Sequence, residues 1–526
     1  MKLRDYQYDC CMAVFRSFDA GRKSLLIQKA TGLGKTVVFC KIAEHWAQQD
    51  LGRVLIIEPT IELVAQTARK VQEICGEFPG IEQASLYSDE DAFTRSNFIV
   101  ACKPSLTSVM RDGRKRYERL EDITLVIVDE AHHSATTAYA EILRYFDCKK
   151  IGFTATPNRH DKVALGELYE DCPYMMDIRK AIDAGWLVSC ATHCIQLQSL
   201  DLSSVETYGK HGDFKLDQLG KAMSADKVVF EIADITAKES VGLKTIVFCA
   251  SVDEAMKVSG ALNDVYQLKA DWVCGDKRRC PDTKRRSVLE SFTCDQDGVQ
   301  IVCNVGVLTT GFDFPGLEHI VMARPTKSLT LFTQIFGRGT RPLAGVVDFD
   351  GSTPDSRKER IAASAKPRFK FTDLRDTSLQ HKLVTPVDVL GGELTIEEAA
   401  AAKKRLEEGL KDIDEAIKEA KEDVREAAER ARLARMRAKS EYRTLVVDPF
   451  MEGVRVVADA PKERGARMPF GKYKGQLVRD LTDGYLEWFM TSTSRSKNPK
   501  LKWLYRSIEK EIDGRKQLNK EALQWA

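Results

Sequence analysis

Three short segments of this 526-residue chain bring together residue types that handle phosphate groups and a bound metal ion. The first is Thr31-Gly32-Leu33-Gly34-Lys35-Thr36, which follows an apolar run and precedes a helical pattern. Backbone N–H groups of a glycine-rich turn at a helix N-terminus can surround a phosphate. Lys35 can then reach the β- and γ-phosphates of ATP, and the Thr36 hydroxyl can bind Mg²⁺. The strict form of this pattern has glycine at position 29, where this chain has Lys29.

The second segment is the apolar run Val126-Ile127-Val128, which ends in Asp129-Glu130. A buried strand that ends in two carboxylates places them at the C-terminal edge of a parallel sheet, beside the phosphate-binding turn. We expect Asp129 to hold Mg²⁺, largely through water, and Glu130 to act as general base on the attacking water. The alternative is an acidic pair on the surface, which the preceding apolar run disfavours.

The third segment, 334–341, carries two arginines, Arg338 and Arg341, in a part of the chain that lacks a phosphate-binding turn. Arginines so placed make sense if they reach across a cleft to the γ-phosphate as arginine fingers. Closure of that cleft would couple ATP hydrolysis to movement of two lobes. Plain surface arginines are the alternative.

A scaffold must position these residues, and the first 160 residues alternate short apolar runs with polar helical stretches. The runs are continuous and rich in β-branched residues, as strands buried on both faces are. Strands that alternate with helices predict a parallel α/β sheet. The expected strands are 24–28, 54–57, 98–101, 125–128 and 151–154.

The same pattern starts again near Thr245 and predicts a second sheet. Its expected strands are 245–248, 299–303, 318–322 and 346–349. The fold class is therefore α/β, with two tandem parallel-sheet lobes, then a long helix and a small C-terminal domain. We expect lobe 1 over 1–185, an interlobe linking region over 186–240, lobe 2 over 241–350 and a linker over 351–395.

Residues 396–440 predict one long charged helix. Its apolar and alanine positions alternate spacings of four and three, which is typical of a coiled-coil seam. These positions are Leu406, Leu410, Ile413, Ile417, Ala420, Val424, Ala427 and Ala431. Two interpretations stay open, namely a coiled coil with a second copy or a partner protein, and a helix that packs back on the lobes.

Composition bounds the class of protein. The net charge of +2 conceals an asymmetry, because residues 461–526 carry 15 Lys and Arg against 8 Asp and Glu, a balance of +7. A basic C-terminal segment indicates contact with something anionic, and a merely solvated terminus is the alternative.

No apolar run is long enough to cross a bilayer and no signal-peptide core is found, so we expect no membrane association and a cytoplasmic protein. The 14 cysteines include no Cys-x-x-Cys pair, which disfavours a zinc ribbon.

Taken in order, the segments resemble the motifs of superfamily 2 helicases of the DEAD/DEAH-box-like kind, over roughly residues 1–350. The resemblance also rests on Asp129-Glu130-Ala131-His132, Thr154-Ala155-Thr156-Pro157 and Thr310-Gly311-Phe312-Asp313. It implies two RecA-like lobes, ATP and Mg²⁺ at the site between them, and ATP hydrolysis coupled to nucleic-acid unwinding.

Roles for further residues follow from this resemblance alone. Gln7 resembles the adenine-reading glutamine, Gly311 and Asp313 belong with the nucleotide-binding residues, and Gln334 joins the catalytic set. The residues expected to couple ATP state to strand grip are His132, Thr154 and Thr156. The residues expected near the nucleic-acid backbone are Thr60, Lys103, Phe248 and Thr309.

The expected substrate also follows from resemblance. The pair His133-Ser134 after the acidic motif and the stretch 178–187 are similar to DNA-acting helicases, restriction-enzyme motor subunits and phage branch-migration helicases. We therefore expect a DNA helicase or translocase that acts on forked, branched or origin DNA in replication or recombination. The compact chain and its tail favour a phage-encoded enzyme, whose location would be the host cytoplasm. An RNA helicase and a nucleic-acid-binding scaffold with a vestigial ATPase are the alternatives.

The stretches 468–475 and 483–488 resemble the small C-terminal module of exonuclease-X-like proteins. Within the first, Lys472 and Lys474 flank Tyr473 between two glycines. Basic side chains around a stacking ring suit single strands or fork junctions. We expect residues 465–526 to form a small basic nucleic-acid-binding or docking module.

Overall fold

The structure is a computed structural model that divides into two units, Met1–Lys439 and Ser440–Ala526, which are described separately. In the first unit it describes residues 2–88, 95–155, 165–209, 212–294, 298–309, 311–349, 351–377, 383–391, 394–407 and 412–439. In the second unit it describes residues 466, 468, 476–481, 486, 489–490 and 502–523.

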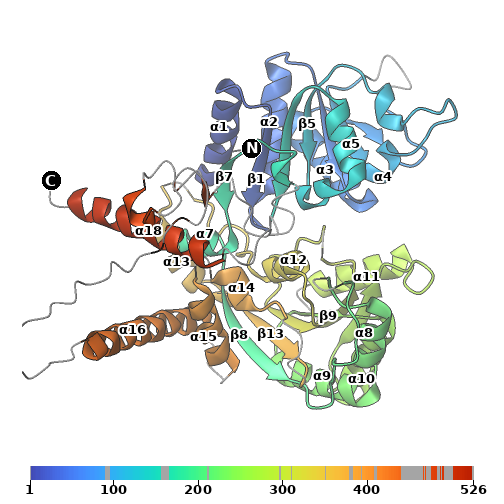
Figure 1. Ribbon diagram of the computed structural model, residues 1–526. Coiled ribbons are helices and arrows are strands. Elements are labelled where there is room, and N and C mark those ends of the chain that lie inside the picture. Colours follow the sequence, from blue (N-terminus) through green and yellow to red (C-terminus); the bar gives the residue numbers. More distant parts are fainter. Residues whose placement is uncertain are drawn as a thin grey trace, which may run out of the picture. The chain divides into compact units, whose positions relative to one another are not determined.

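The described part of lobe 1 contains a seven-stranded sheet in the order β3-β4-β2-β5-β6-β1-β7, with every pair parallel (Figure 1). The strands are β1 (Ser24–Lys29), β2 (Arg53–Glu58), β3 (Gly80–Glu82), β4 (Phe98–Cys102), β5 (Ile123–Val128), β6 (Lys149–Thr154) and β7 (Asp171–Met176). The five strands predicted from apolar runs are confirmed. The sequence did not predict the two edge strands, β3 and β7.

Both faces of this sheet are covered, which is why the middle of β2, β4 and β5 is continuously apolar. One face carries α1 (Asp5–Asp19), α2 (Lys35–Gln48) and α3 (Ile61–Cys75). The other carries η2 (Arg116–Arg119) and α5 (Thr137–Tyr145), with the short helices α4 (Lys103–Leu106) and η3 (Ala131–Ala135) at the strand ends. Successive residues serve opposite faces, so Ile56 packs under α2 and α3 while Ile57 packs under α5.

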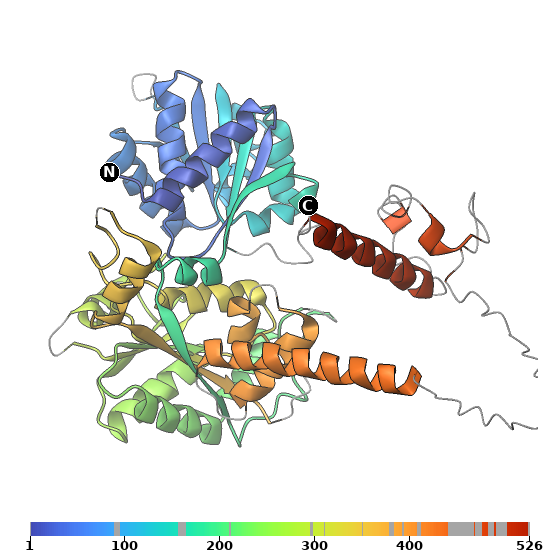
Figure 2. The same ribbon diagram turned by 90° about the vertical axis from the view of Figure 1, so that its left-hand side faces the viewer.

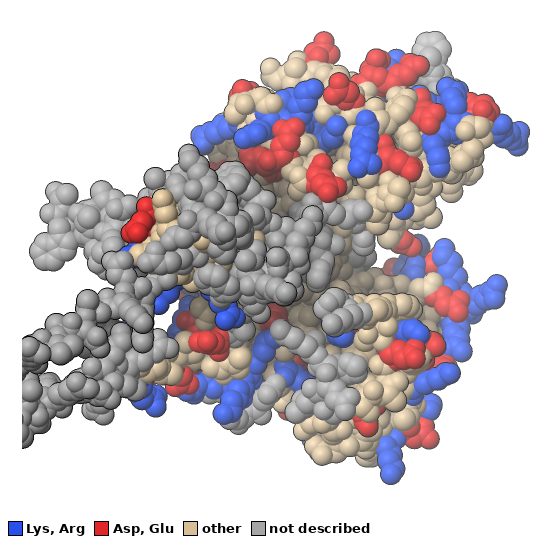
Figure 3. All heavy atoms as spheres, viewed as in Figure 1, with Lys and Arg blue, Asp and Glu red and all other residues tan. Residues whose placement is uncertain are grey.

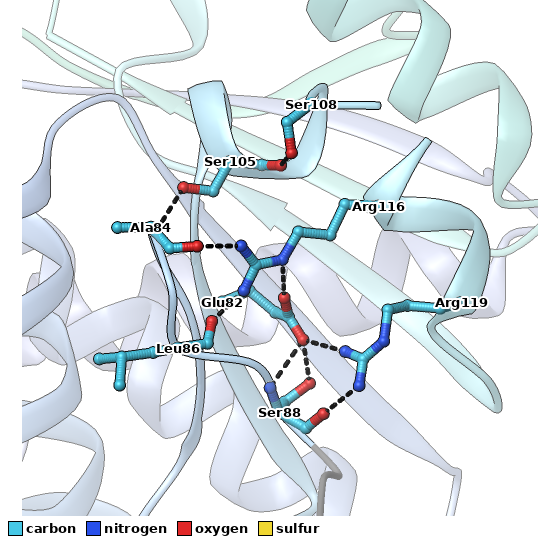
Figure 4. A network of polar contacts seen from close by, with 8 residues as sticks. All are labelled: Glu82, Ala84, Leu86, Ser88, Ser105, Ser108, Arg116 and Arg119. Atoms are coloured by element: carbon cyan, nitrogen blue, oxygen red, sulfur yellow. Dashed lines mark hydrogen bonds and ion pairs between the residues drawn. The ribbon is translucent and has the colours of Figure 1, made fainter. Parts of the chain in front are cut away.

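A buried charge network fastens the loop that follows β3 (Figure 4). The Glu82 carboxylate lies 2.5 Å from guanidinium nitrogens of both Arg116 and Arg119. Arg116 also donates to the carbonyls of Ala84 and Leu86, and Arg119 donates to the Ser88 carbonyl. The network therefore holds main-chain atoms of the loop Gln83–Ser88.

The described part of lobe 2 contains a six-stranded parallel sheet in the order β10-β11-β9-β12-β13-β8. The strands are β8 (Ser189–Gln196), β9 (Thr245–Cys249), β10 (Ala270–Cys274), β11 (Ile301–Val305), β12 (His319–Ala323) and β13 (Arg368–Arg375). The strands predicted over 245–248, 299–303 and 318–322 are confirmed within two residues at either end.

Three predictions for this lobe are wrong. Residues 346–349 form a loop, in which Val347 is buried, Val346 is half-buried against the same core and Asp348 pairs with Arg4. The expected linking region 186–240 contributes β8 and two helices to lobe 2, and the expected linker 351–395 contributes β13. Both strands are rich in polar residues, so neither has the continuous apolar run by which β9, β11 and β12 were recognised, and the short strand β10 was not predicted either.

Helices cover both faces of the second sheet as well (Figure 1). One face carries α8 (Leu216–Met223), α9 (Asp226–Glu239) and α10 (Val252–Asp264). The other carries α11 (Asp282–Thr293), α12 (Leu329–Gly339) and α14 (Pro386–Leu390). Between the lobes lie α7 (Ile178–Asp183) and α13 (Pro354–Ala362), whose Arg357 donates to the Ala184 carbonyl at 2.8 Å.

The single long helix predicted over 396–440 is wrong. The chain forms two helices, α15 (Ile396–Glu407) and α16 (Ile413–Lys439), joined by Arg405–Asp423 at 2.6 Å. Asp412 starts a new helix, because its carboxylate accepts the backbone N–H groups of residues 414 and 415 and caps the N-terminus of α16. The seam residues that pack into the lobe 2 core are Leu406, Ile413, Ile417 and Ala420. Figure 2 shows the C-terminal half of α16 extending beyond lobe 2.

The second unit has a small apolar core of its own. Its described elements are η4 (Val478–Asp480) and α18 (Lys502–Leu523). The buried residues are Met468, Val478, Leu481, Leu486, Phe489, Leu504, Tyr505 and Ile508. Lys472, Tyr473 and Lys474 lie outside the described residues. In the described part of the whole chain, no helix is both long and apolar enough to cross a membrane.

Candidate active site

The phosphate-binding turn connects β1 to α2, as the sequence predicts. Gly32 and Gly34 have φ angles of 88° and 68°, a region that favours glycine. A Cβ at Gly34 would lie 2.8 Å from Nε2 of Gln7, and a Cβ at Gly32 would lie 3.2 Å from Cγ of Arg341. The turn therefore leaves a cradle at the N-terminus of α2, where free backbone N–H groups attract phosphate.

Lys35 at the start of α2 meets the acidic pair that follows β5. Its Nζ lies 2.6 Å from Oε1 of Glu130 and 3.6 Å from Oδ1 of Asp129. Although burial opposes the charged form, the two carboxylates raise the pKa of Lys35, so it stays an ammonium. Burial raises the pKa of Asp129, and Lys35 counteracts this. Glu130 has a φ of 48°, and such uncommon backbone for a non-glycine residue often marks a functional site.

A third carboxyl group lies beside this pair and was missed from the sequence. Glu58 is fully buried at the end of β2, and one of its oxygens accepts the Thr67 hydroxyl at 2.6 Å. Burial and the nearby Asp129 raise its pKa well above the ordinary value. Glu58 thus adds a third buried carboxyl group beside the acidic pair. Its signal in the sequence is a single acidic residue at the end of an apolar strand.

The two arginines of α12 and its C-terminus face the same site from lobe 2. Arg338 donates to the Thr309 carbonyl at 2.7 Å and to the Phe312 carbonyl, and Arg341 pairs with Asp313. Burial lowers the pKa of both arginines, and for Arg338 the neighbouring Arg341 lowers it further. Two buried guanidinium groups side by side are costly, and an anionic phosphate between them would lower that cost.

The two lobes bring these groups to one cavity of about 630 Å³. Its lining includes Thr31, Gly32, Gly34, Lys35, Thr36, Asp129, Glu130, Gly311, Asp313, Gln334, Arg338 and Arg341, which the sequence predicted, together with charged residues of α3 that it did not, namely Arg69, Lys70 and Glu73. The contact between lobes is close, because a Cβ at Gly337 would lie 2.8 Å from Cβ of Thr31. Gln66 of α3, which the sequence did not predict, donates to the Gly311 carbonyl at 2.7 Å and ties lobe 1 to the loop that holds the arginines.

Gln7 contacts the turn between β1 and α2 at Leu33 and Gly34. Its Nε2 donates to the Leu33 carbonyl at 3.3 Å, and its Oε1 accepts the Arg4 backbone N–H at 3.0 Å. The Arg4 guanidinium pairs with Asp348 of lobe 2, its Nε 2.6 Å from Oδ1. Trp186 packs edge-on against Tyr6, with ring centroids 4.9 Å apart. The expected adenine-reading segment is thus in contact with lobe 2.

Two of the three expected coupling residues lie together. The His132 Nδ1 lies 3.3 Å from the Thr154 hydroxyl and 3.3 Å from Oε2 of Glu130. The imidazole therefore links the acidic pair to the end of β6. Thr156 lies outside the described residues.

The residues expected near nucleic acid have mixed outcomes. Thr60 caps α3 and lines a groove of about 380 Å³ that also includes Lys277 and Arg285 of lobe 2. Lys103 lies at the start of α4, and the Thr309 carbonyl accepts Arg338. The expectation for Phe248 is wrong for its side chain, which is 2% exposed and packs in the lobe 2 core.

Lys29, which replaces the glycine of the strict phosphate-binding pattern, does not enter the cradle. It is the last residue of β1, and its buried Nζ lies 4.7 Å from the centroid of the Tyr6 ring. Burial lowers its pKa to about 8. The departure from the pattern therefore leaves the phosphate site intact.

The donor set of the cavity fits ATP with Mg²⁺. Lys35, Arg338 and Arg341 supply positive charge, and Thr36 and Asp129 supply the hard oxygen ligands that Mg²⁺ prefers. Mg²⁺ keeps several waters and needs few protein ligands. The described residues contain no group of three His, Cys, Asp or Glu side chains arranged to hold a metal ion.

Three segments of the chain match known families. Residues 1–159 match "Type III restriction enzyme, res subunit", and residues 226–342 match "Helicase conserved C-terminal domain". Residues 464–495 match "Putative quorum-sensing-regulated virulence factor". The expected likeness of the tail to exonuclease-X-like proteins stays a prediction.

Named helicases from other organisms are similar to much of this chain. "Putative ATP-dependent helicase IRC3" of Saccharomyces cerevisiae is 28% identical and covers 67% of this chain and 52% of that protein. "ATP-dependent DNA helicase uvsW" of Enterobacteria phage T4 is 21% identical and covers 73% of each. The chain spans about half the length of the first two curated relatives it matches.

The fold has a counterpart among solved structures. A fragment of an HsdR subunit of a type I restriction enzyme from Vibrio vulnificus matches with a TM-score of 0.53 and 23% identity, covering 74% of this chain and 66% of that one. The two lobes, the motifs gathered between them and these matches agree on one family. The chain belongs to the superfamily 2 helicases, with two RecA-like lobes.

Proposed function

We propose that this protein hydrolyses ATP in the cavity between its lobes and uses the cycle to move along or unwind DNA. One observation carries the proposal: Lys35, Asp129 and Glu130 of lobe 1 share a cavity with Arg338 and Arg341, some 200 residues further along the chain. Their convergence on one cavity makes sense for phosphoryl transfer.

The ion pair of Lys35 with Glu130 suggests the first step. Triphosphate in the cradle offers Lys35 a stronger anionic partner, so the ammonium turns from Glu130 to the phosphates. Glu130 is then released to accept a proton from the attacking water, and His132 holds its second oxygen. Mg²⁺, when bound by Thr36 and Asp129, neutralises phosphate charge.

Charge that develops on the γ-phosphate meets the arginines of lobe 2. Arg338 and Arg341 can stabilise it only while the lobes are together, because they belong to the other lobe. After hydrolysis that attraction falls, and the contacts Gln66–Gly311 and Thr31–Gly337 are free to part. The lobes therefore close when ATP binds and open after hydrolysis, once in each chemical cycle.

The groove beside the cavity is the proposed path of one nucleic-acid strand. It is lined by the N-terminus of α3 at Thr60 and by Lys277 and Arg285. A helix N-terminus and basic side chains suit a phosphate backbone. Figure 3 shows acidic and basic side chains interspersed on the viewed face of both lobes, so local contacts in the groove, rather than one broad field, would hold the strand.

DNA is the proposed substrate because several relatives carry DNA-directed names, including the DNA helicase of phage T4 and restriction endonuclease subunits of Escherichia coli. Action on forked, branched or origin DNA, in replication or recombination and in a phage setting, is part of the proposal. RNA is the second candidate, because one relative is named an RNA helicase.

ATP turnover measured without polymer and with single-stranded DNA, duplex DNA or RNA tests the proposal. We expect DNA to stimulate turnover most, and the Glu130→Gln protein to be inactive with every polymer. Stimulation by RNA alone would select the RNA helicase. Polymer binding without turnover by the wild-type protein would indicate a scaffold with a vestigial ATPase.

A further inference from the structure

Lys366 lies outside every motif, in the segment between α13 and β13 that the sequence presented as a linker. Its side chain is among the largest that are fully buried, and only 2% of the residue is exposed. Its Nζ donates to two main-chain carbonyls at 2.8 Å, those of Pro315 and Arg341. One ammonium group thus joins two segments that are 26 residues apart.

Both of these segments help to hold Arg341, the proposed arginine finger. The Arg341 guanidinium contacts the Phe312 carbonyl and the Asp313 carboxylate. The Arg341 main chain is joined through Lys366 to Pro315, two residues further on. The side chain and the main chain of Arg341 are therefore both held against the same four-residue segment, 312–315.

The lysine is costly at this place. Burial lowers the pKa of Lys366 to about 7, Glu318 opposes this fall and Arg341 adds to it. A methionine would fill the same space without the cost of burying an ammonium. A lysine at this position supplies a donor that reaches both carbonyls, which a methionine cannot do.

We propose that Lys366 is a positioning residue for ATP hydrolysis, which fixes the main chain of Arg341 so that its guanidinium meets the γ-phosphate. The inference rests on the proposed function. A displacement of about 1 Å in a catalytic group can cost a hundredfold in rate, so loss of this clamp is expected to lower kcat. Nucleotide binding, which depends on the lobe 1 cradle, is expected to stay.

The test compares kcat and KM for ATP, at saturating DNA, in the full-length Lys366→Met and Lys366→Gln proteins. Methionine removes the donor, and glutamine is too short to reach both carbonyls while it keeps polarity. We expect kcat to fall at least about tenfold in both, with KM for ATP within about twofold of wild type. The thermal unfolding midpoint is measured for each protein, so that the folded fraction is known.

The chain offers a matched control in Lys244, which also donates to two main-chain carbonyls of lobe 2, those of Cys294 and Val299, at 3.0 Å. Cys294 directly follows α11 and Val299 precedes β11, whereas Arg341 follows α12. Lys244→Met is expected to lower the unfolding midpoint but to leave kcat of the folded protein within about twofold of wild type.

A double-substitution cycle isolates the route of the effect. If Lys366 acts through Arg341, adding Lys366→Gln to Arg341→Ala costs no further rate, whereas Lys244→Met combines with Arg341→Ala additively. Wild-type kcat in folded Lys366→Gln, or full additivity with Arg341→Ala, would overturn the inference alone. A wild-type protein that hydrolyses no ATP would overturn the proposed function, and this inference with it.

Discussion

At the scale of single residues, substitutions of Lys35 and Glu130 should differ in their effect on ATP binding although both stop hydrolysis. We predict that Lys35→Ala and Glu130→Gln both abolish ATP turnover, because one removes the phosphate ligand and the other the base. Glu130→Gln also removes one negative charge from beside the triphosphate site, so it should bind ATP at least as well as wild type. Titration with a fluorescent ATP analogue checks this, and equal loss of binding in both variants would refute the assigned roles.

The Arg341 side chain lies in the lobe that lacks the phosphate cradle, so its removal should spare binding. We predict that Arg341→Ala lowers kcat roughly a thousandfold while KM for ATP changes little. Steady-state kinetics at saturating DNA measures both. Arg375, buried in the same lobe beside Asp373, provides a control arginine whose replacement should affect folding rather than the turnover of folded protein.

Lys29 gives a pH-dependent prediction for stability. Burial lowers its pKa to about 8 from an ordinary value of 10.5, so the unfolded chain binds this proton more tightly than the folded chain. Stability therefore rises as pH increases from 8 towards 10.5, and the full cost is present below pH 8. Lys29→Met should stabilise the protein on the order of 3 kcal/mol at pH 7 and less at pH 9.5. Denaturant unfolding at both pH values checks this, and an equal gain at both would contradict it.

The sequence predicted residues whose side-chain types suit contact with phosphate, metal or water, and the structure gathers most of them around one cavity. It missed three residues that make contacts between distant parts of the chain. Gln66 donates to a carbonyl of the other lobe, and Asp348 pairs with Arg4 near the N-terminus. Lys366 donates to two distant carbonyls. Such contacts depend on where the main chain passes. A pattern of residue types along the sequence therefore does not predict these contacts.

At the scale of elements, the α15–α16 hairpin belongs to lobe 2 and should stabilise it. Ile413 is 1% exposed in the lobe 2 core, so Ile413→Ala should cost about 2–5 kcal/mol. Val424 lies further along the same seam and is only half-buried, so Val424→Ala should cost under about 1 kcal/mol. Thermal unfolding of both variants measures the difference. Similar losses would place the two halves of α16 in equivalent surroundings.

The elements predicted correctly are those buried on both faces, because burial demands continuous apolar residues. β8 and β13 lie towards one edge of their sheet, and polar residues such as His193 and Asp373 interrupt their apolar pattern. The helix over 396–440 was predicted as one because its heptad spacing runs through the break. Gly409 followed by Asp412 is a stop-and-start signal that outweighs that spacing.

At the scale of the whole molecule, the motor residues all precede residue 342, whereas the +7 balance lies in 461–526. We predict that a chain ending at residue 460 keeps basal ATP hydrolysis but binds DNA more weakly and with a flatter salt dependence. Tyr473→Ala in the full chain should weaken single-strand binding by about 1–3 kcal/mol if the ring stacks on a base. Superimposable curves of affinity against salt would assign the tail to a protein partner.

The network around Glu82 also determines which changes the neighbouring loop can accept. Arg116 and Arg119 hold the loop through its carbonyl oxygens, and the Arg116 guanidinium also lies 3.6 Å from the centroid of the Tyr87 ring. These contacts do not depend on the side chains of Ser85 and Leu86. Leu86 is 55% exposed, whereas Cys294 is the single exposed residue among the 14 described cysteines. Replacing Cys294 by serine and Leu86 by cysteine would therefore give a rigid attachment point for a fluorophore on lobe 1, from which the opening and closing of the lobes can be followed in real time.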